Sequence, residues 1–298
     1  MAHVPSLSDL KGLLDALTAT RYLAAAGTVI ALYDHSLTFS QEIEYIWKRP
    51  KWSASPFMYL LNRYGVEAAL LYVSYADFTD QCQHLSTCQA FILAIGTIAV
   101  LSMTLGNIYA ILRIYSLWDQ RKGALYALGA GFAVCYTTLF VMFALALKDL
   151  FFVAAYSPLF DTCIFGVKPK TYVGIWASMA AFDVYALCLV VFNALDRPHR
   201  GQHIQVLDDL NRDGAVSNLV LFLIRLANLI MSIKLGPADM FLGIFLIWAL
   251  ISVTMSRLML RVEALRLTTH HTWPSTVSLM QLYDMGGGHP DTPLFPRK

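Results

Sequence analysis

Seven long apolar stretches dominate the chain and decide which class of protein it can form. A window of about 19 residues, the length that crosses a bilayer as a helix, finds them at roughly 20–38, 56–76, 89–112, 124–147, 172–194, 215–234 and 239–259. Only 14% of the residues are charged and 57% are hydrophobic, whereas ordinary soluble domains carry about 25% charged residues. We therefore predict an all-α, polytopic membrane protein with seven transmembrane helices.

The distribution of basic residues predicts the orientation of these helices. With the N-terminus outside, fourteen of the 22 Lys and Arg residues lie in inner segments and six in outer ones, while Arg63 and Arg225 lie inside spans. Cytoplasmic loops carry the excess of Lys and Arg, so we predict an N-out, C-in protein. Its expected parts are a short outer segment (1–19), the seven-helix transmembrane domain (20–266) and a mostly disordered cytoplasmic tail (267–298).

Three of the five cysteines fall in expected outer connections, where an oxidising compartment permits a disulfide. A bridge between Cys88 and Cys163 would join the start of the third span to the second outer loop. Cys82 with Cys88 is the competing local pair, and the spacing does not choose between them. Cys135 and Cys188 lie inside spans and are interpreted as packing residues.

The stretch LYDHSLTFSQEIEYIW, residues 32–47, adds ionisable groups where the first span should reach the inner membrane boundary. One interpretation, which we favour, is a helix that leaves the membrane and is solvated there, because inner boundaries commonly carry charge. The other makes Asp34, His35 and Glu42 a proton relay or a metal site. His35 and Glu42 are seven residues apart, about 10 Å along a straight helix, so one ion could not bind both directly. No metal or cofactor is therefore expected.

Several stretches resemble one family of membrane proteins. They are LYDH at 32–35, the segment 42–47, LNRY at 61–64, RIYSLW at 113–118, NRDG at 211–214 and SRLMLRVE at 256–263. They are similar to a fungal, chiefly basidiomycete, family of unknown function, number six-five-three-three in the domain-of-unknown-function series, with the best motifs in residues 22–66. The resemblance implies seven spans and a packing or trafficking role for Asp34, His35 and Arg63. It implies no activity, ligand or catalytic residue.

Ionisable residues at membrane depth form the other candidate site. Asp183 and Arg225 lie roughly 15 Å from the inner ends of consecutive antiparallel spans, so an ion pair between them is geometrically easy. The full candidate cluster near the midplane is Asp183, Arg225, Glu67, Arg63, Asn107 and Asn228. These residues form either closed ion pairs that hold helices together or the lining of a cavity or pathway. Such residues are functional candidates because their burial is costly.

The topology favours a receptor-like sensor or signal transducer. Arg113, at the inner end of the third span, is similar to the Arg-Tyr element of G-protein-coupled receptors, although Leu112 stands where an acidic residue is expected. The alternatives are an enzyme that acts on a prenyl or lipid-like substrate through Glu67 or Asp183 as acid, and a small-molecule or proton transporter. The seventh span has no lysine for a retinal Schiff base.

The expected partners follow from the same features. They are membrane lipids, an unidentified small-molecule ligand and a cytoplasmic effector at the basic inner loops. No nucleic acid is expected, since the net charge is only +2. The expected location is the plasma membrane or an endomembrane.

Overall fold

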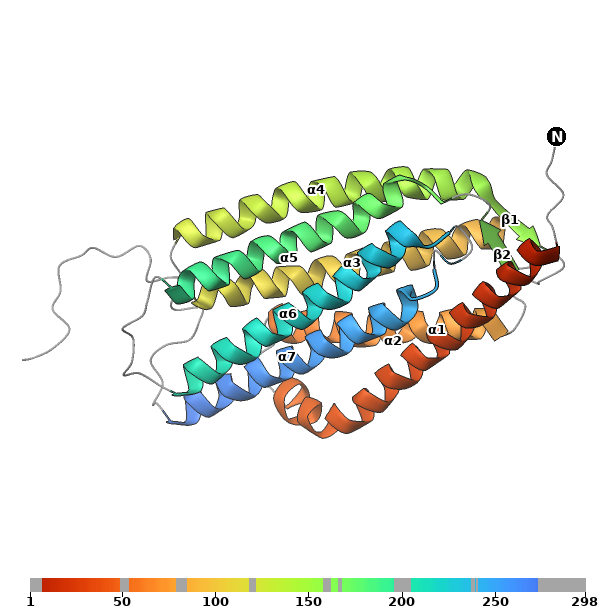
Figure 1. The fold of residues 1–298 in the computed structure, drawn as a ribbon. Helices are drawn as coiled ribbons and strands as arrows, with labels where there is room; N and C mark the ends of the chain where they lie inside the picture. Colours follow the sequence, from red (N-terminus) through yellow and green to blue (C-terminus); the bar gives the residue numbers. More distant parts are fainter. Residues whose placement is uncertain are drawn as a thin grey trace, which may run out of the picture.

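The computed structural model describes residues 7–48, 54–78, 85–117, 122–157, 162–165, 168–195, 205–236, 239 and 241–272. Within these residues the chain forms seven long α-helices, one short π-helix and one β-hairpin (Figure 1). Their bounds are α1 Leu7–Glu42, η1 Ile43–Trp47, α2 Ala54–Phe78, α3 Leu85–Leu117, α4 Lys122–Val153, β1 Ala154–Ser157, β2 Thr162–Phe165, α5 Thr171–Leu195, α6 Gln205–Lys234 and α7 Ile244–Thr272.

Proline is placed so that it does not interrupt these helices. The one proline within a helix, Pro56, lies in the first turn of α2, where a backbone N–H would have no intrahelical acceptor. The other proline in the described residues, Pro169, precedes the first residue of α5. Uninterrupted apolar sequence therefore forms helices of 25 to 36 residues.

The seven helices follow the order of the seven predicted spans, but several extend further. The first begins at Leu7 rather than near residue 20, so it includes most of the expected outer segment. Likewise α6 begins at Gln205 and α7 continues to Thr272. The rest of the expected tail, residues 273–298, lies outside the described residues.

Among the described residues, five helices are long and apolar enough to cross a membrane. The qualifying segments are Ser86–Tyr115, Lys122–Val153, Thr171–Phe192, Val216–Lys234 and Ile244–Ala264. They indicate an integral membrane protein of the all-α class. Seven crossings remain a prediction, because charged and polar residues lower the mean hydropathy of α1 and α2.

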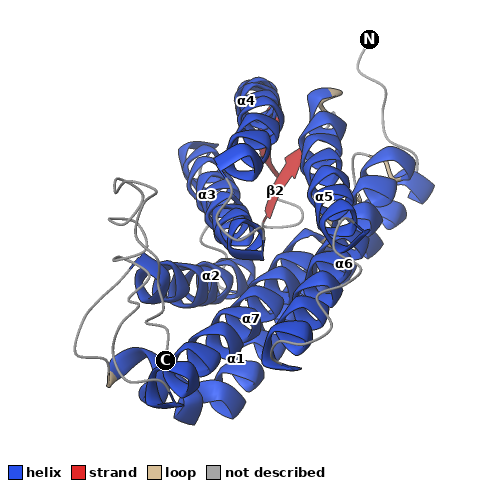
Figure 2. Ribbon diagram, turned by 90° about the vertical axis from the view of Figure 1, so that its left-hand side faces the viewer, coloured by secondary structure: helices blue, strands red, loops and turns tan. Residues whose placement is uncertain are grey.

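The helices close into a ring, which Figure 2 shows end-on. Each helix contacts the next one in the sequence, and α7 also contacts α1 and α2. Apolar side chains from all seven helices form one buried cluster between them. Large apolar side chains such as Tyr22, Val134 and Phe192 are exposed on the outside, as expected of a surface that faces lipid.

A close approach of α1 to α7 depends on Gly27. A Cβ atom at this position would lie 3.0 Å from the Cα atom of Leu246 and 3.3 Å from the backbone oxygen of Phe245. Small residues at helix interfaces of membrane proteins allow such contact between backbones. The contact brings the polar residues of α1 within reach of α7.

One end of the bundle is fastened by a hairpin and a disulfide. Strands β1 and β2 pair antiparallel, with Tyr156 opposite Cys163. Of the two cysteine pairings expected, the structure contains Cys88–Cys163, which joins the start of α3 to β2. At the same end, Lys168 Nζ donates hydrogen bonds of 2.6 Å to the backbone oxygens of Ser232 and Leu235, which satisfies carbonyl groups at the end of α6.

The disulfide predicts a measurable loss of stability when it is removed. Cys88 and Cys163 are 75 residues apart, and the chain-entropy estimate for such a loop is about 4 kcal/mol. We expect Cys163→Ser to lower the free energy of unfolding by up to that amount. Thermal unfolding of the protein in lipid nanodiscs, with and without reductant, measures the effect.

Cys188→Ser is the matched control, because Cys188 is a free cysteine on the exposed side of α5. It should leave the unfolding temperature unchanged. If Cys82→Ser, and not Cys163→Ser, removed the reductant-sensitive step, the competing pair would be the one that forms.

Candidate functional site

The predicted polar residues lie in two separate networks rather than in one midplane cluster. The first, called here the His35 network, consists of Asp34, His35, Glu42, Arg63, Glu67 and Arg257. The second, called the Asp183 network, consists of Asn107, Tyr136, Asp183 and Arg225. Glu67 pairs with Arg63, and both side chains face α1, whereas Asp183 pairs with Arg225. Of the two arrangements that the sequence left open, the structure therefore contains the separate ion pairs.

Asp34 joins three helices in the His35 network. Its Oδ2 atom lies 2.6 Å from Nη1 of Arg63 on α2, and its Oδ1 atom lies 2.5 Å from Nε of Arg257 on α7. Arg63 also donates a hydrogen bond of 3.3 Å to the hydroxyl of Thr38. The carboxylate is thereby held between two guanidinium groups, and it connects α1 to both neighbours.

His35 lies between two carboxylates. Its Nδ1 atom is 2.7 Å from Oε2 of Glu67, and its Nε2 atom is 3.2 Å from Oε2 of Glu42. Glu67 is also 3.0 Å from Nε of Arg63, although that N–H is not directed at the oxygen, so the contact is electrostatic rather than a hydrogen bond. The network therefore gathers three carboxylates, two guanidiniums and one imidazole from α1, α2 and α7.

Glu42 is fully buried and accepts hydrogen bonds from three aromatic side chains. The donors are Trp47 Nε1 at 2.8 Å, the Tyr64 hydroxyl at 2.7 Å and the Tyr59 hydroxyl at 3.0 Å. Trp47 lies five residues after Glu42, which matches the i→i+5 spacing of the π-helix η1. The backbone N–H of Lys48 donates to the Ile43 oxygen over the same spacing, so side-chain and backbone contacts both support this turn.

The interpretation of this stretch as a solvated helix end was wrong. Asp34 is 3% exposed and Glu42 is 0% exposed, because α2 and α7 cover the face of α1 that carries them. His35 and Glu42 also come closer than their helical rise suggested, since their side chains reach toward each other. Glu42 and Glu67 approach opposite nitrogens of the ring, so they do not converge on one ion. Among the described residues no group of His, Cys, Asp and Glu side chains is arranged to hold a metal.

The Asp183 network connects α5, α6, α3 and α4. Arg225 Nη1 lies 2.6 Å from Oδ1 of Asp183, which is the ion pair that the antiparallel spans predicted. The same nitrogen donates to Oδ1 of Asn107 at 3.1 Å, and Asn107 Nδ2 donates to the Tyr136 hydroxyl. Arg225 is 1% exposed, so its charge depends on these acceptors.

Two further predicted residues are buried. Asn228 is buried on α6, and its Nδ2 atom has no partner in the described part of the chain. Arg113 is buried on α3.

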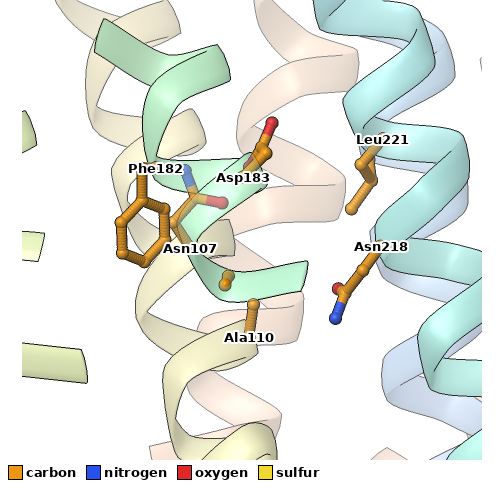
Figure 3. Close-up of a pocket in the computed structure, with 7 residues that line it drawn as sticks. Asn107, Ala110, Phe182, Asp183, Asn218 and Leu221 are labelled. Carbon is orange, nitrogen blue, oxygen red and sulfur yellow. The ribbon is translucent and has the colours of Figure 1, made fainter. Parts of the chain in front are cut away.

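A pocket lies beside the ion pair, and Figure 3 shows its lining. It contains about 270 Å³ of empty space, including the part that opens outward. The lining residues are Asn107, Ala110, Phe182, Asp183, Ala186, Asn218 and Leu221. The Oδ2 atom of Asp183 has no hydrogen-bond partner in the described residues, and the carboxyl group lies on the wall of this pocket.

Sequence reasoning missed several residues of both networks. Tyr59, Tyr64 and Tyr136 are contacts of buried polar groups. Tyr59 and Tyr64 lie near an expected membrane boundary, where tyrosines are also typical of an interfacial belt, and no local pattern indicates the contact of Tyr136 in the middle of α4. Arg257 lies 223 residues after Asp34, and only the packing of α7 on α1 brings them together. The spacing of Trp47 five residues after Glu42 was a signal that could have indicated the π-helical turn and the contact between these two side chains.

Comparison with known proteins adds a family match over part of the chain. Residues 22–66 match a family of unknown function (DUF6533). Comparison with curated proteins and with solved structures finds no match. The matched segment includes Asp34, His35, Glu42 and Arg63, so it covers most of the His35 network and none of the Asp183 network.

Loss of the Glu42 carboxylate should destabilise the His35 network more than loss of any one of its donors. Glu42→Ala leaves three buried donors without an acceptor, and we expect it to lower the free energy of unfolding by about 3 kcal/mol or more. Tyr59→Phe removes one donor and should cost about 1 kcal/mol. Thermal unfolding in nanodiscs compares the stability of the two variants.

Glu44→Ala is the control for this series, because Glu44 is exposed on the adjacent π-helix. A surface change of this kind should stay within about 0.5 kcal/mol. Equal effects of Glu42→Ala and Glu44→Ala would contradict the assigned role of Glu42.

The ion pair of the Asp183 network predicts a non-additive mutant series. Asp183→Asn leaves a buried guanidinium without its counter-charge, which should cost about 3–5 kcal/mol. The double variant Asp183→Asn with Arg225→Gln removes both charges and should be less damaged. The loss of stability in each variant is measured by the yield of folded protein and by its unfolding temperature. Equal losses in the single and the double variant would contradict the pairing.

Proposed function

We propose that this chain is a receptor-like sensor that crosses a membrane seven times, with its N-terminus outside and its C-terminus in the cytoplasm. The observation that carries the proposal is the Asp183–Arg225 ion pair. It joins α5 to α6 next to a pocket, and it leaves one carboxylate oxygen without a partner among the residues that the structure describes.

The pairing of the charges on α1 and α2 supports seven crossings. These helices have 36 and 25 residues, or about 54 Å and 37 Å at 1.5 Å per residue, and both exceed the roughly 30 Å of a hydrocarbon core. The charged groups that make them less apolar face partners inside the bundle. Paired charges that face a bundle interior are the ones that membrane helices tolerate.

Two features support the proposed orientation. Basic residues gather in the segments assigned to the inner side. The Cys88–Cys163 disulfide lies at the end of the bundle where α1 begins (Figure 1), and disulfides persist in oxidising compartments outside the cytosol. A plasma membrane or endomembrane location fits this arrangement, with a cytoplasmic effector at the basic inner loops.

A sensor needs an element with two arrangements that a ligand can bias. In this chain α6 packs between α5 and α7, and its buried Arg225 is held by acceptors from α5 and α3. A ligand that engages Asp183 changes the contacts of Arg225. The position of α6 relative to α5 therefore depends on what occupies the pocket.

The enzyme alternative finds less support. An acid-initiated reaction requires a carboxyl group that is free to protonate the substrate. Glu67 lies 3.0 Å from Arg63 and Asp183 lies 2.6 Å from Arg225, so both carboxyls are engaged as ion-pair partners. A small-molecule or proton transporter is the second candidate. The oxygen of Asp183 that has no partner in the described residues lies at membrane depth, where it can also accept a hydrogen bond from a molecule that crosses the membrane.

The sensor proposal predicts that α6 moves when its ion pair is removed. Spin labels at Val191→Cys on α5 and Val216→Cys on α6, both exposed positions, report the separation of these helices by double electron–electron resonance. The background carries Cys82→Ala, Cys135→Ala and Cys188→Ala, which remove the cysteines outside the Cys88–Cys163 disulfide. In protein that also carries Asp183→Asn with Arg225→Gln, we expect the distance distribution to shift or broaden by several ångströms.

Labels at Val141→Cys on α4 and Val184→Cys on α5 give the control pair, since both positions are exposed and these helices pack together without the ion pair. Their distance should not change. An unchanged α5–α6 distance in the double variant would show that packing alone positions α6, and the sensor proposal would fail.

A further inference from the structure

The pocket beside Asp183 offers a hydrogen-bond acceptor that no side chain in the described part of the chain uses. The Asp183 side chain is 10% exposed, and its Oδ2 atom has no partner in the described residues. An unpartnered buried carboxylate oxygen is costly, so a molecule that donates a hydrogen bond to it is stabilised there. The missing partner is a donor, since an ionised carboxylate only accepts.

The charge of the surroundings decides which donor fits. Asp183 and Arg225 together are neutral, and a cationic donor such as an ammonium group would add a buried charge without a counter-ion, which is unfavourable. An anion is equally unsuited, because Arg225 does not line the pocket and its Nη1 atom already donates to Asp183 and Asn107. A neutral hydroxyl group supplies the hydrogen bond without adding charge.

The remaining lining decides what the hydroxyl is attached to. Four of the lining residues are apolar: Ala110, Phe182, Ala186 and Leu221. Figure 3 shows Phe182 and Leu221 on opposite sides of Asp183, with Asn218 across from Ala110. The enclosed part has room for about one water molecule, so it accepts only the end group of a ligand, and the rest of the ligand must lie in the part that opens outward. The space suits a slim hydroxyl end followed by a hydrocarbon stem.

We infer that this pocket binds the hydroxyl group of an apolar primary alcohol, which donates to Asp183 Oδ2 while its first carbons contact Phe182, Ala186 and Leu221. This inference rests on the proposed function in one respect, because it names the ligand class of the proposed sensor. Binding itself is measured without reference to signalling.

The test is retention of 1-dodecanol by the protein in lipid nanodiscs, measured by native mass spectrometry. Dodecane, dodecylamine and dodecanoate are added in parallel at the same mole fraction of lipid. We expect one bound dodecanol per chain and a preference over dodecane of about tenfold or more, the value of one hydrogen bond to a charged acceptor. Dodecylamine and dodecanoate should bind no better than dodecane.

Ala186→Phe fills the pocket without altering the ion pair, and it should abolish retention of dodecanol. Ala181→Phe is the matched control, because Ala181 is exposed on another face of the same helix, and it should bind like the wild type. Ala110→Leu, which fills the pocket from α3, is the second blocking variant if Ala186→Phe does not fold.

Three results would overturn the inference. They are no retained dodecanol, stronger retention of dodecylamine or dodecanoate, and equal retention by the wild type and both blocking variants. Failure of the proposed function gives a different result. If dodecanol binds but the α5–α6 distance in the double variant is unchanged, the alcohol site is supported and the sensor proposal is rejected. If that distance shifts but dodecanol does not bind, the sensor proposal is supported and the alcohol site is rejected.

Discussion

The structure depends on the pairing of two buried guanidinium groups. Arg63 and Arg225 are each 1% exposed, and a buried cation without a counter-charge is strongly unfavourable. Each therefore requires a carboxylate from a neighbouring helix: Asp34 on α1 for Arg63, and Asp183 on α5 for Arg225. These two requirements fix which faces of α1, α2, α5 and α6 turn toward one another, and apolar packing fills the space between them.

The two networks differ in what surrounds their unpartnered atoms. In the His35 network, Glu42 accepts three hydrogen bonds and Asp34 contacts two arginines, and the unpartnered Oε1 atom of Glu67 lies 3.0 Å from Nε of Arg63. In the Asp183 network, one carboxylate oxygen has no partner in the described residues and adjoins empty space. An unsatisfied acceptor beside a pocket favours a binding role, whereas charged groups that face one another favour a fixed arrangement of their helices. The His35 network is accordingly the framework, and the Asp183 network is the better candidate for a site.

The sequence predicted the structural features that depend on one helix or on two consecutive helices. Long apolar runs predicted the helices, and similar depth in antiparallel neighbours predicted the contact of Asp183 with Arg225. What it missed depends on helices far apart in the chain. The burial of Asp34 requires α7, whose Arg257 no local pattern connects to it. The choice of Cys163 over Cys82 as partner of Cys88 required the position of the hairpin, since spacing alone allowed both.

Helix α7 lies between the two networks, and this placement relates them physically. It contacts α6, which carries Arg225, and it contributes Arg257 to Asp34 on α1. The side chain of Arg257 is 50% exposed, so of the two guanidiniums on Asp34 it is the one that can leave without becoming buried and unpaired. Asp34 would then keep Arg63 as its counter-charge. A displacement of α6 can therefore be transmitted through α7 to the contact of Arg257 with Asp34, which is released at low cost because Arg257 is half-exposed. The contacts of Glu42 and Arg63 meanwhile keep α1 and α2 together.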